Sequence, residues 1–470
     1  MRPYPRLLVA GTGGDAGKTL VSLALIVAFR DDGLAVAAFK KGPDFIDAAW
    51  LGWAAGRPGR NLDTYMVGAD AVELGFRRRG EPAGLNLIEG NRGLLDGLDA
   101  EGTHSSAALA RLTRTPVVLV TSPVKVTATA AATVLGLQKL APGVEIAGVI
   151  LNRVSGERHR QVVTRAIEEH TGVPVLGAIP RVEGPLLTSR HLGLVPPAEH
   201  GPAEELRRTL ADLARAHVDL GRLREVAQGA VPLEPAGEDG TPGSAGAGFP
   251  RPRIGYFSDS AFTFYYPENL EALEREGAEL TAVSALGDTR LPELDALYIG
   301  GGFPETHTAQ LAGNRVLHAD LRRRVKAGLP VYAECGGLMY LAERLETADG
   351  EVELAGVLPV RVKLHRRPQG HGYSRVIVDA PNPIFPVGTE LQGHEFHYSA
   401  LSGGRERVAT AYRVEKGSGV GEGRDGIVHG QVLASYLHLH AHGTPAWARG
   451  LTAAARTHAA SRNLTAGDSS

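Results

Sequence analysis

The sequence predicts an α/β protein made of two doubly wound domains. At 470 residues the chain is too long for one hydrophobic core, so two or three domains are expected. Short apolar runs alternate with longer amphipathic stretches in both halves, as in a sheet wound with helices. A segment rich in Gly, Pro, Ala and Ser separates the halves at residues 229–252. We therefore expect one domain over residues 1–228 and a second over residues 253–460.

Six apolar runs in the first half predict buried parallel strands, because each is continuous, rich in β-forming residues and bounded by Gly, Pro or charged residues. The expected strands are residues 7–10, 35–39, 85–89, 116–121, 146–151 and 174–178. Helices are expected between them, for example over residues 18–29, 105–112 and 158–170. This alternation predicts a doubly wound sheet.

The second half repeats the alternation after a flexible linker over residues 229–252. Strands are expected at residues 254–257, 279–283, 296–299 and 330–333, and helices at residues 267–276 and 314–327. Beyond residue 352 the pattern becomes more β-like, and it ends in a strand within residues 430–437 and a helix over residues 445–456. The polar residues 461–470 are expected to form a frayed tail.

The composition excludes several classes of protein. Hydrophobic residues make up 43% of the chain and charged residues 22%, which excludes collagen and wholesale disorder. The net charge is -2, so no global basic field favours nucleic acid or an anionic membrane. The longest apolar runs are too short to span a bilayer, and no signal peptide is evident. One cysteine excludes a disulfide framework and a Cys-rich zinc site, and a cytoplasmic enzyme or NTPase is expected.

A glycine-rich segment after the first strand predicts a phosphate-binding loop. It has the sequence GTGGDAGKT over residues 11–19, a form of the P-loop that is one residue longer than usual. Its N–H groups can turn towards phosphate oxygens, while Lys18 reaches the terminal phosphates and Thr19 can ligate Mg²⁺. The glycines expected to line the nucleotide are Gly11, Gly13, Gly14 and Gly17. The alternative is a plain glycine-rich turn between strand and helix.

Carboxylates at the ends of other strands are the expected partners of that loop. Glu89 ends an apolar strand beside the ligand crevice of an open sheet, and Asp63 is a second, weaker Mg²⁺ ligand. The segment KKGPDFID over residues 40–47 suits an anionic ligand and a metal. Its expected binding residues are Lys40, Lys41, Asp44 and Asp47. A solvated glutamate and a solvated turn of mixed charge are the alternatives.

Cys335 is predicted to be a nucleophile. It stands where a strand becomes a glycine-started helix, an arrangement that resembles a nucleophile elbow with Cys in place of Ser. The helix N-terminus would stabilise its thiolate. The alternative is an inert, buried structural cysteine.

A cysteine nucleophile needs an oxyanion hole and a base. Gly301 and Gly302 follow a strand and can direct peptide N–H groups at a developing oxyanion. His438 and His440 point to the same side of an extended segment, so spacing does not choose the base between them. His394 and His397 are competitors, and their spacing differs from that of a helical metal-binding pair.

The motifs together resemble those of the cobyrinic acid a,c-diamide synthases, a family of glutamine-dependent amidotransferases of corrinoid biosynthesis. They extend almost end to end and include GTGGDAGKT, KKGPDFID, IEGNRGLLDG, GVILNRV, SRHLGL, YIGGGFPE, ECGGLMYL, GHEFHYS and ASYLHLH. The resemblance implies a P-loop NTPase domain like that of dethiobiotin synthetase and a domain like the class I glutamine amidotransferases. It implies that ATP and Mg²⁺ activate the a and c acetate carboxylates as acyl phosphates, and that ammonia from glutamine displaces the phosphate.

The same resemblance assigns roles to individual residues. It implies that Cys335 is the glutaminase nucleophile, that His438 is the catalytic base, and that Glu89 is the acid at the metal. The usual glutaminase has H-x-E, but the third position here is His440, so a Cys–His dyad is expected.

Other interpretations stay open at this level. The same reaction could act on hydrogenobyrinate or nickel sirohydrochlorin, since both present paired acetate chains. A protein of another class, a P-loop regulatory ATPase with a degenerate amidotransferase domain, would have lost Cys335 or His438, and both are present. Glutamine, ATP and a tetrapyrrole are the expected partners, without nucleic acid or membrane. The oligomeric state is left open, with a homodimer as one alternative.

Overall fold

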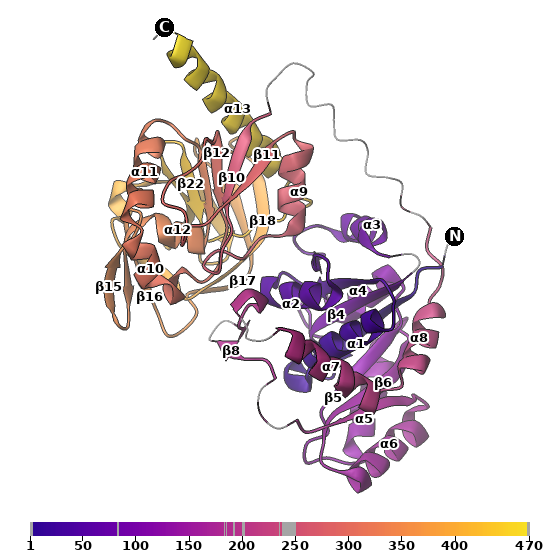
Figure 1. Cartoon of the computed structure of the whole chain (residues 1–470). Coiled ribbons are helices and arrows are strands. Elements are labelled where there is room, and N and C mark those ends of the chain that lie inside the picture. Colours follow the sequence, from indigo (N-terminus) through magenta and orange to yellow (C-terminus); the bar gives the residue numbers. More distant parts are fainter. Residues whose placement is uncertain are drawn as a thin grey trace. The chain divides into compact units, whose positions relative to one another are not determined.

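The computed structural model divides the chain into two compact units, which we describe separately (Figure 1). One unit comprises Met1–Thr64 and Gly68–Glu238, and the other comprises Tyr65–Val67 and Asp239–Ser470. The structure describes residues 3–81, 84–182, 184, 186–190, 193–199, 203–234, 236 and 251–467. The main division falls within residues 229–252, the segment expected to be a linker, of which residues 235 and 237–250 lie outside the described part.

The first unit is built on a seven-stranded sheet in which every pair of neighbours is parallel. The strand order is β3-β2-β4-β1-β5-β6-β7. The strands are β1 (Arg6–Gly11), β2 (Val36–Lys41), β3 (Arg60–Leu62), β4 (Leu85–Gly93), β5 (Val117–Thr121), β6 (Ile146–Val154) and β7 (Val175–Pro180). Because β1 lies between β4 and β5 and is buried along its whole length, the loop that follows it opens at the middle of the sheet.

Helices connect these strands in the alternation that the sequence predicts. They are α1 (Lys18–Asp31), α2 (Phe45–Ala55), α3 (Ala69–Arg79), α4 (Ser106–Thr113), α5 (Thr129–Leu140), α6 (Glu157–Thr171), α7 (Ala203–His217) and α8 (Leu220–Gln228). Helix α1 packs against α2 and α7, whereas α5 packs against α6. The short hairpin β8 (Ser189–Arg190) and β9 (Gly193–Leu194) brackets residues 191–192 of the SRHLGL motif, which lie outside the described residues.

All six strands expected in this unit are present, and β3 is an addition to their sheet. It contains only Arg60, Asn61 and Leu62, so it gives no apolar run that the sequence could reveal. It forms because Asn61 lies in register with Lys40 of β2 at the edge of the sheet. This strand matters because it carries Asp63 to the same edge as the other expected ligands.

The second unit contains a nine-stranded mixed sheet and a separate four-stranded sheet. Five parallel strands, in the order β11-β10-β12-β13-β22, continue into the antiparallel strands β21-β20-β17-β18. The smaller sheet has the order β15-β14-β16-β19. The strands are β10 (Arg253–Phe257), β11 (Glu279–Val283), β12 (Ala296–Ile299), β13 (Val331–Glu334), β14 (Ala342–Thr347), β15 (Gly350–Glu353), β16 (Leu358–Leu364), β17 (Gly370–Val378), β18 (Glu390–His397), β19 (Ser399–Gly403), β20 (Ala409–Lys416), β21 (Arg424–His429) and β22 (Val432–Ser435).

The helices of the second unit are α9 (Pro267–Arg275), α10 (Thr308–Gly313), α11 (Arg315–Lys326), α12 (Gly336–Leu341) and α13 (Pro445–Gly467). Helices α9, α11, α12 and α13 begin within one residue of where the sequence predicts a helix, whereas α10 was not predicted. Helix α13 runs well past residue 456, so residues 461–467 are helical, whereas a frayed tail was expected from residue 461.

Alternating residues of the central strands build two apolar clusters, one on each face of the larger sheet. In β12, Leu297 and Ile299 belong to one cluster, while Ala296 and Tyr298 belong to the other. This follows from the two-residue period of a strand, and it explains why β12 is a continuous apolar run. The layers fix the ends of β12, β13 and β22, where the expected nucleophile and base lie.

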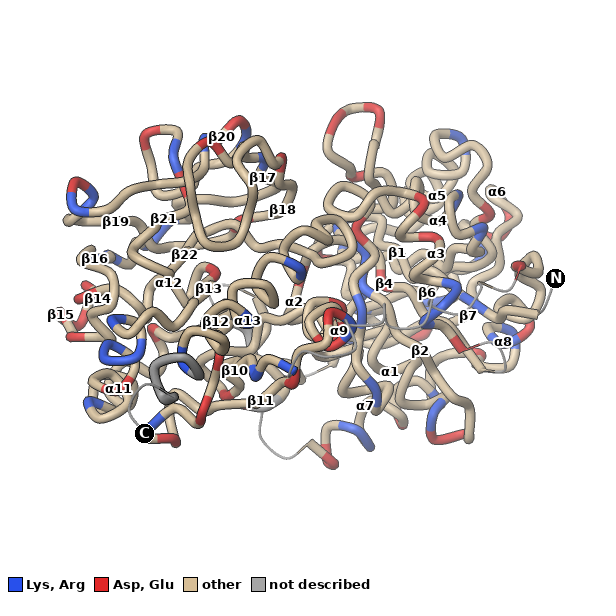
Figure 2. The backbone as a smooth tube through the Cα atoms, turned by 90° about the horizontal axis from the view of Figure 1, so that it is seen from above, with Lys and Arg blue, Asp and Glu red and all other residues tan. Residues whose placement is uncertain are grey.

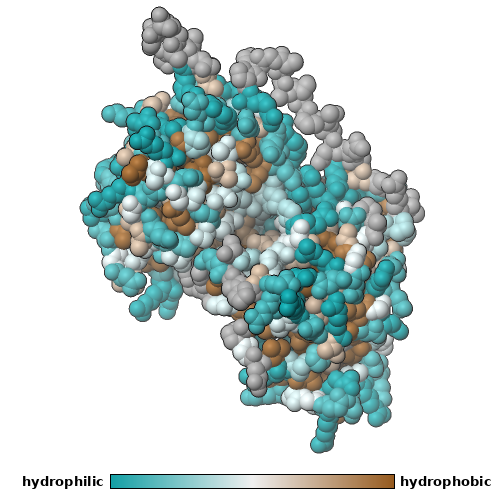
Figure 3. Space-filling view, viewed as in Figure 1, coloured by the Kyte–Doolittle hydropathy of each residue, from teal (hydrophilic) through white to brown (hydrophobic). Residues whose placement is uncertain are grey.

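The surface agrees with the composition. Figure 2 shows basic and acidic residues interspersed along the tube, as expected from a net charge of -2. The face in Figure 3 is mostly hydrophilic, with hydrophobic residues scattered over it. Among the described residues, no helix has the length and apolar character needed to cross a membrane.

Candidate active sites

The phosphate-binding loop joins β1 to α1 and has the backbone that its glycines allow. Gly17 has φ 93°, in the left-handed region that favours glycine. A Cβ at Gly17 would also lie 2.0 Å from Asn152 Nδ2, which donates a hydrogen bond to the Ala16 carbonyl (2.9 Å). Around Gly13 and Gly14, by contrast, an added Cβ would meet no atom within 4 Å. The loop is thus tight at its helix end and open where phosphate would enter.

Lys18 lies under this open part of the loop. Its side chain is buried, and its Nζ donates to the carbonyl oxygens of Gly14 (3.2 Å) and Gly13 (3.4 Å). Burial, helped by the charge of Lys40, lowers the pKa of Lys18. An anion in the loop would therefore both replace the carbonyl contacts and favour the charged ammonium.

Thr19 and Glu89 lie together as expected for a metal site. Thr19 Oγ1 donates to Glu89 Oε1 (2.8 Å), and Lys40 Nζ is 2.8 Å from the same oxygen and 2.6 Å from Asp47 Oδ2. Burial raises the pKa of Glu89 despite the nearby Lys40. Although burial alone would lower the pKa of Lys40, Asp47 and Glu89 raise it above its ordinary value. Lys40 is therefore an internal counter-ion of the two carboxylates in this structure.

The donors at this position fit Mg²⁺. Glu89 Oε2 is fully buried and has no hydrogen-bond partner among the described residues, so one carboxylate oxygen remains for a cation. The described part of the chain gathers no group of three or more His, Cys, Asp or Glu that could hold a metal. Two protein ligands are enough for Mg²⁺, which takes its other ligands from waters and phosphates.

The remaining expected residues lie at the same edge of the sheet. Asp63 directly follows β3 and is buried. Burial lowers the pKa of Lys41, and the charge of Asp63 raises it in part. Asp44 caps α2, since its Oδ1 accepts from the Asp47 N–H (2.8 Å). The Asn61 amide donates to the carbonyls of Gly42 and Asp44, which fixes this turn. The structure thus gives Asp44 and Asn61 a part in shaping the turn.

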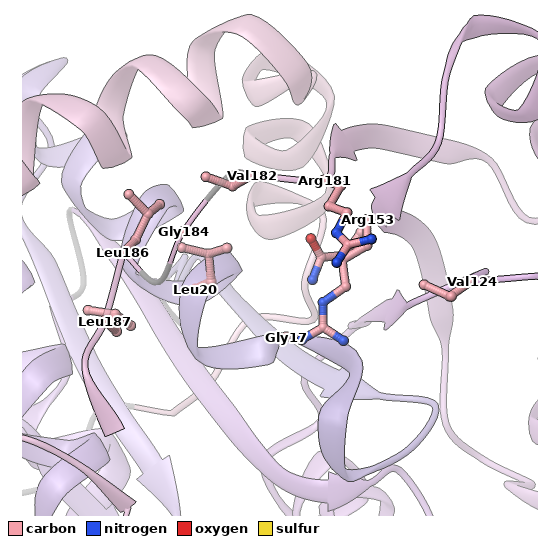
Figure 4. Close-up of a pocket in the computed structure, with 10 residues that line it drawn as sticks. Gly17, Leu20, Val124, Arg153, Arg181, Val182, Gly184, Leu186 and Leu187 are labelled. Atoms are coloured by element: carbon pink, nitrogen blue, oxygen red, sulfur yellow. The ribbon is translucent and has the colours of Figure 1, made fainter. Parts of the chain in front are cut away.

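A cavity of about 470 Å³ adjoins the loop at Gly17 and was not expected from the sequence (Figure 4). Figure 4 shows Leu20, Leu186 and Leu187 on one side and Arg153 and Arg181 on the other. The Asn152 amide also lines it. The GVILNRV motif places Asn152 and Arg153 at the end of β6. Polar residues at that strand end were the sequence feature from which the cavity could have been predicted. An apolar wall next to a phosphate loop suits the nucleoside part of a nucleotide.

Cys335 forms the expected elbow between β13 and α12. Its φ of 46° and ψ of -97° are unusual for a residue with a side chain. Its own N–H donates to the Ser435 carbonyl (2.7 Å), so that group is already engaged. Burial, followed by the charge of Glu305, raises the pKa of the Cys335 thiol. The thiol therefore needs a base, and the six-residue helix after it does not by itself generate the thiolate.

Gly301 lies beside His438, and Gly302 lies beside Gly336, the residue that follows Cys335. A Cβ on Gly301 would be 2.6 Å from His438 Cε1, and a Cβ on Gly336 would be 3.0 Å from the Gly302 nitrogen. The preceding Gly300 N–H donates to Tyr265 Oη (2.8 Å). This leaves the next two N–H groups as the candidates for an oxyanion hole.

The contacts of His438 differ from those of the other candidate histidines. His438 is buried, its backbone forms a β-bridge with that of His394, and the two rings stack with centroids 4.9 Å apart. Its Nδ1 is 3.4 Å from Glu334 Oε2. Burial, with a contribution from His438, lowers the pKa of His394 well below its usual value, so His394 is neutral.

The other two histidines face elsewhere. His440 Nδ1 accepts from the His442 N–H (3.2 Å), its Nε2 is 3.6 Å from Glu268 Oε2, and its ring packs on Tyr266. His397 Nδ1 bonds the Ser399 carbonyl (2.7 Å), and its Nε2 is 3.3 Å from Glu395 Oε2. Only the tertiary structure distinguishes these rings from His438.

The chain matches two family models, one over each unit. Residues 7–192 match the CobQ/CobB/MinD/ParA nucleotide binding domain, and residues 253–446 match the CobB/CobQ-like glutamine amidotransferase domain. These descriptions agree with the phosphate loop in the first unit and the cysteine elbow in the second.

Curated relatives match over nearly the whole length. A cobyrinate a,c-diamide synthase of Magnetococcus marinus is 44% identical, covering 95% of this chain and 96% of that protein. One of Archaeoglobus fulgidus is 41% identical, covering 93% and 94%. One of Listeria innocua is 38% identical, covering 94% and 97%.

Proposed function

The chain belongs to the cobyrinate a,c-diamide synthase family, and on that premise we propose that it amidates the a and c acetate carboxylates of cobyrinic acid. It is a ligase that forms C–N bonds with glutamine as the nitrogen donor, and it uses ATP. The proposal specifies the substrate, an acyl-phosphate intermediate and the residues that act at each step.

The first unit activates the carboxylate. A substrate carboxylate oxygen attacks the γ-phosphorus of ATP, the bond from that phosphorus to ADP breaks, and an acyl phosphate results. The N–H groups around Gly13 and Gly14 and the Lys18 ammonium bind the phosphates, while Thr19 and Glu89 would hold Mg²⁺. When bound, Mg²⁺ neutralises phosphate charge during the transfer. Ammonia then adds to the acyl carbon, phosphate leaves, and loss of a proton gives the amide.

The second unit supplies the ammonia. His438 takes the proton of the Cys335 thiol, and the sulfur attacks the side-chain amide carbon of glutamine. The N–H groups of Gly301 and Gly302 stabilise the oxyanion. The protonated His438 gives its proton to the leaving ammonia, and water then hydrolyses the thioester to glutamate.

The observation that supports this assignment best is the joint presence of both reacting groups. A P-loop alone implies use of a nucleotide, and a cysteine elbow alone implies acyl transfer. Together they supply the two half-reactions of a glutamine-dependent amidation. A regulatory ATPase with a degenerate second domain would not need the buried Cys335 and His438.

Mass spectrometry of the tetrapyrrole products tests the substrate. The purified protein, ATP and Mg²⁺ are incubated with cobyrinic acid, hydrogenobyrinic acid or nickel sirohydrochlorin, and with glutamine or ammonium. We expect a monoamide and then a diamide from cobyrinic acid with either nitrogen source. Amidation of hydrogenobyrinic acid or nickel sirohydrochlorin without amidation of cobyrinic acid would overturn the substrate assignment. If none of the three rings is amidated, the proposed reaction is overturned.

A further inference from the structure

A buried carboxylate touches the catalytic histidine from a direction that the sequence did not suggest. Glu334 is the residue directly before Cys335, at the end of β13, and it is 1% exposed. Its Oε2 is 3.4 Å from His438 Nδ1. The position two residues after the base, where the third member of the triad usually stands, holds His440, whose ring faces Glu268.

Among the described residues, the oxygens of the Glu334 carboxylate face hydrogen-bond donors. Oε1 accepts from Tyr332 Oη (3.1 Å) and from the Leu439 N–H (3.2 Å), and Oε2 accepts from Tyr298 Oη (3.2 Å). Burial, with a contribution from Glu334, raises the pKa of both tyrosines well above the usual value. Both stay protonated and can donate, so the carboxylate is held in one orientation.

This orientation determines where the imidazole carries its proton. A hydrogen bond in which the Glu334 carboxylate is the acceptor places a proton on His438 Nδ1. In the neutral ring, Nε2 is then the basic atom. Cε1, which joins the two ring nitrogens, lies against Gly301, beside the expected oxyanion hole.

The sheet register explains how one strand serves both groups. β13 pairs with β22 in parallel, with Glu334 opposite Ser435. His438 follows Ser435 by three residues, and the Leu439 N–H returns to the Glu334 carboxylate. The positive φ of Cys335 turns the nucleophile out of this strand while Glu334 remains buried within it.

We propose that Glu334 is the positioning residue of the glutaminase site, replacing the acid that the H-x-E pattern lacks. It holds His438 with the proton on Nδ1 and stabilises the imidazolium that forms when the Cys335 proton moves to Nε2. The proposal rests on the glutaminase reaction described above. Glu334 acts through His438 and does not touch glutamine.

The test exchanges Glu334 for its neutral isostere. E334Q should lower kcat for glutamine hydrolysis by about 10²-fold or more, because the amide can hold the ring in the wrong tautomer. The KM for glutamine should stay within about twofold, since no substrate contact is lost. Y340F is the matched control, because it also removes one polar atom from the buried core of this unit, and the Tyr340 hydroxyl has no hydrogen-bond partner among the described residues.

The pH dependence of Cys335 alkylation distinguishes a role through His438 from the direct charge of Glu334. Cys335 is the only cysteine, so iodoacetamide incorporation reports this site alone. Loss of imidazolium stabilisation should move the E334Q profile to higher pH by about one unit or more. The Glu334 charge also raises the pKa of the thiol directly. An unchanged profile, or a shift to lower pH, would therefore overturn the proposal.

Ammonium-driven amidation separates the possible failures. Its retention in E334Q demonstrates a folded synthetase, and wild-type protein without glutaminase activity would contradict the proposed function instead. If E334Q does not fold, E334D tests the proposal instead, because it keeps the carboxylate but moves it away from His438 Nδ1 by the length of one methylene. E334D should reduce kcat and shift the profile part of the way, whereas wild-type behaviour would overturn the proposal.

Discussion

Single side chains determine the chemistry of both sites through their immediate contacts. Lys18 is held by loop carbonyls, Lys40 neutralises Glu89 and Asp47, and Cys335 is buried with a raised pKa. In each case burial makes a missing partner costly. Because each side chain contacts only one of the two sites, we expect a substitution to alter either the ATP-dependent amidation or the hydrolysis of glutamine and to leave the other reaction in place.

Lys18→Ala should stop amidation with either glutamine or ammonium as nitrogen source. The ammonium group neutralises phosphate charge that develops during transfer, so we expect a loss of about 10²-fold or more. Product formation by mass spectrometry measures the loss, and glutamate release should persist at a measurable rate. Lys139→Ala, on an exposed site of α5, serves as control. Near wild-type amidation with ammonium would contradict the P-loop assignment.

His438→Ala should abolish glutamine hydrolysis, while His440→Ala should cost clearly less. Loss of a general base reduces the rate by about 10²–10⁴-fold. His440 faces Glu268 and Tyr266, so its removal leaves the contact between His438 and Glu334 intact. Glutamate release compares the two variants, and both should retain amidation driven by ammonium. A larger loss at His440 would reverse the assignment.

Whole elements place these groups by ordinary packing. The parallel strands bring their carboxyl ends to one edge, where β1, β2, β3 and β4 present the loop, Lys40, Asp63 and Glu89. In the second unit, β12, β13 and β22 do the same for Gly301, Cys335 and His438. Some helices also carry buried polar residues that have no part in either reaction. We expect these residues to affect the free energy of unfolding.

His318 on α11 should make the second unit sensitive to acid. It is 4% exposed, its Nε2 has no hydrogen-bond partner in the described part of the chain, and its ring packs on Tyr340. Burial, followed by Arg322, lowers its pKa to about 4. As the pH falls, His318 therefore becomes protonated in the unfolded chain before it does in the folded protein. Its contribution to the free energy of unfolding is lost as pH falls from about 6.5 towards 4. At pH 5 the loss is about 2 kcal/mol.

His318→Leu should remove this loss. Urea unfolding at pH 7.5 and pH 5 measures it as the difference between wild type and variant. The comparison cancels other groups such as Asp425, whose pKa burial raises to about 6, so that its contribution is lost instead as pH rises through this value. An equal fall in stability for both proteins would contradict the assignment.

At the scale of the whole molecule, the nucleotide binding domain and the glutamine amidotransferase domain fall in separate compact units of one chain. Among the described residues, the seven-stranded sheet belongs to the first unit and the nine-stranded and four-stranded sheets belong to the second. This arrangement predicts that one reaction can be removed without unfolding the site of the other.

Cys335→Ser should abolish amidation driven by glutamine and preserve amidation driven by ammonium. The serine lacks the reactive sulfur, while the phosphate loop is unchanged and free ammonia replaces the missing supply. Alkylation of wild-type protein with one equivalent of reagent should have the same effect. Loss of both activities in a folded variant would contradict the model of two separate sites.

The sequence by itself determined the fold class, six of the seven strands in the sheet of the first unit, the phosphate loop and the cysteine elbow. These depend on local signals: continuous apolar runs, glycines where the backbone must turn, and reactive side chains at strand ends. The same signals could not reveal β3, because three residues including Arg60 and Asn61 carry no apolar pattern and pair only through β2.

Only the tertiary structure decided which histidine lies beside Glu334 and Gly301. His438 and His440 share a face in an extended segment, so their separation required the bridge from His438 to His394 and the packing of His440 on Tyr266. Glu334 lies next to Cys335 in sequence but 104 residues from His438, so its contact with the ring depends on the β13–β22 register. Long-range pairing brings such groups together, and no local pattern encodes it.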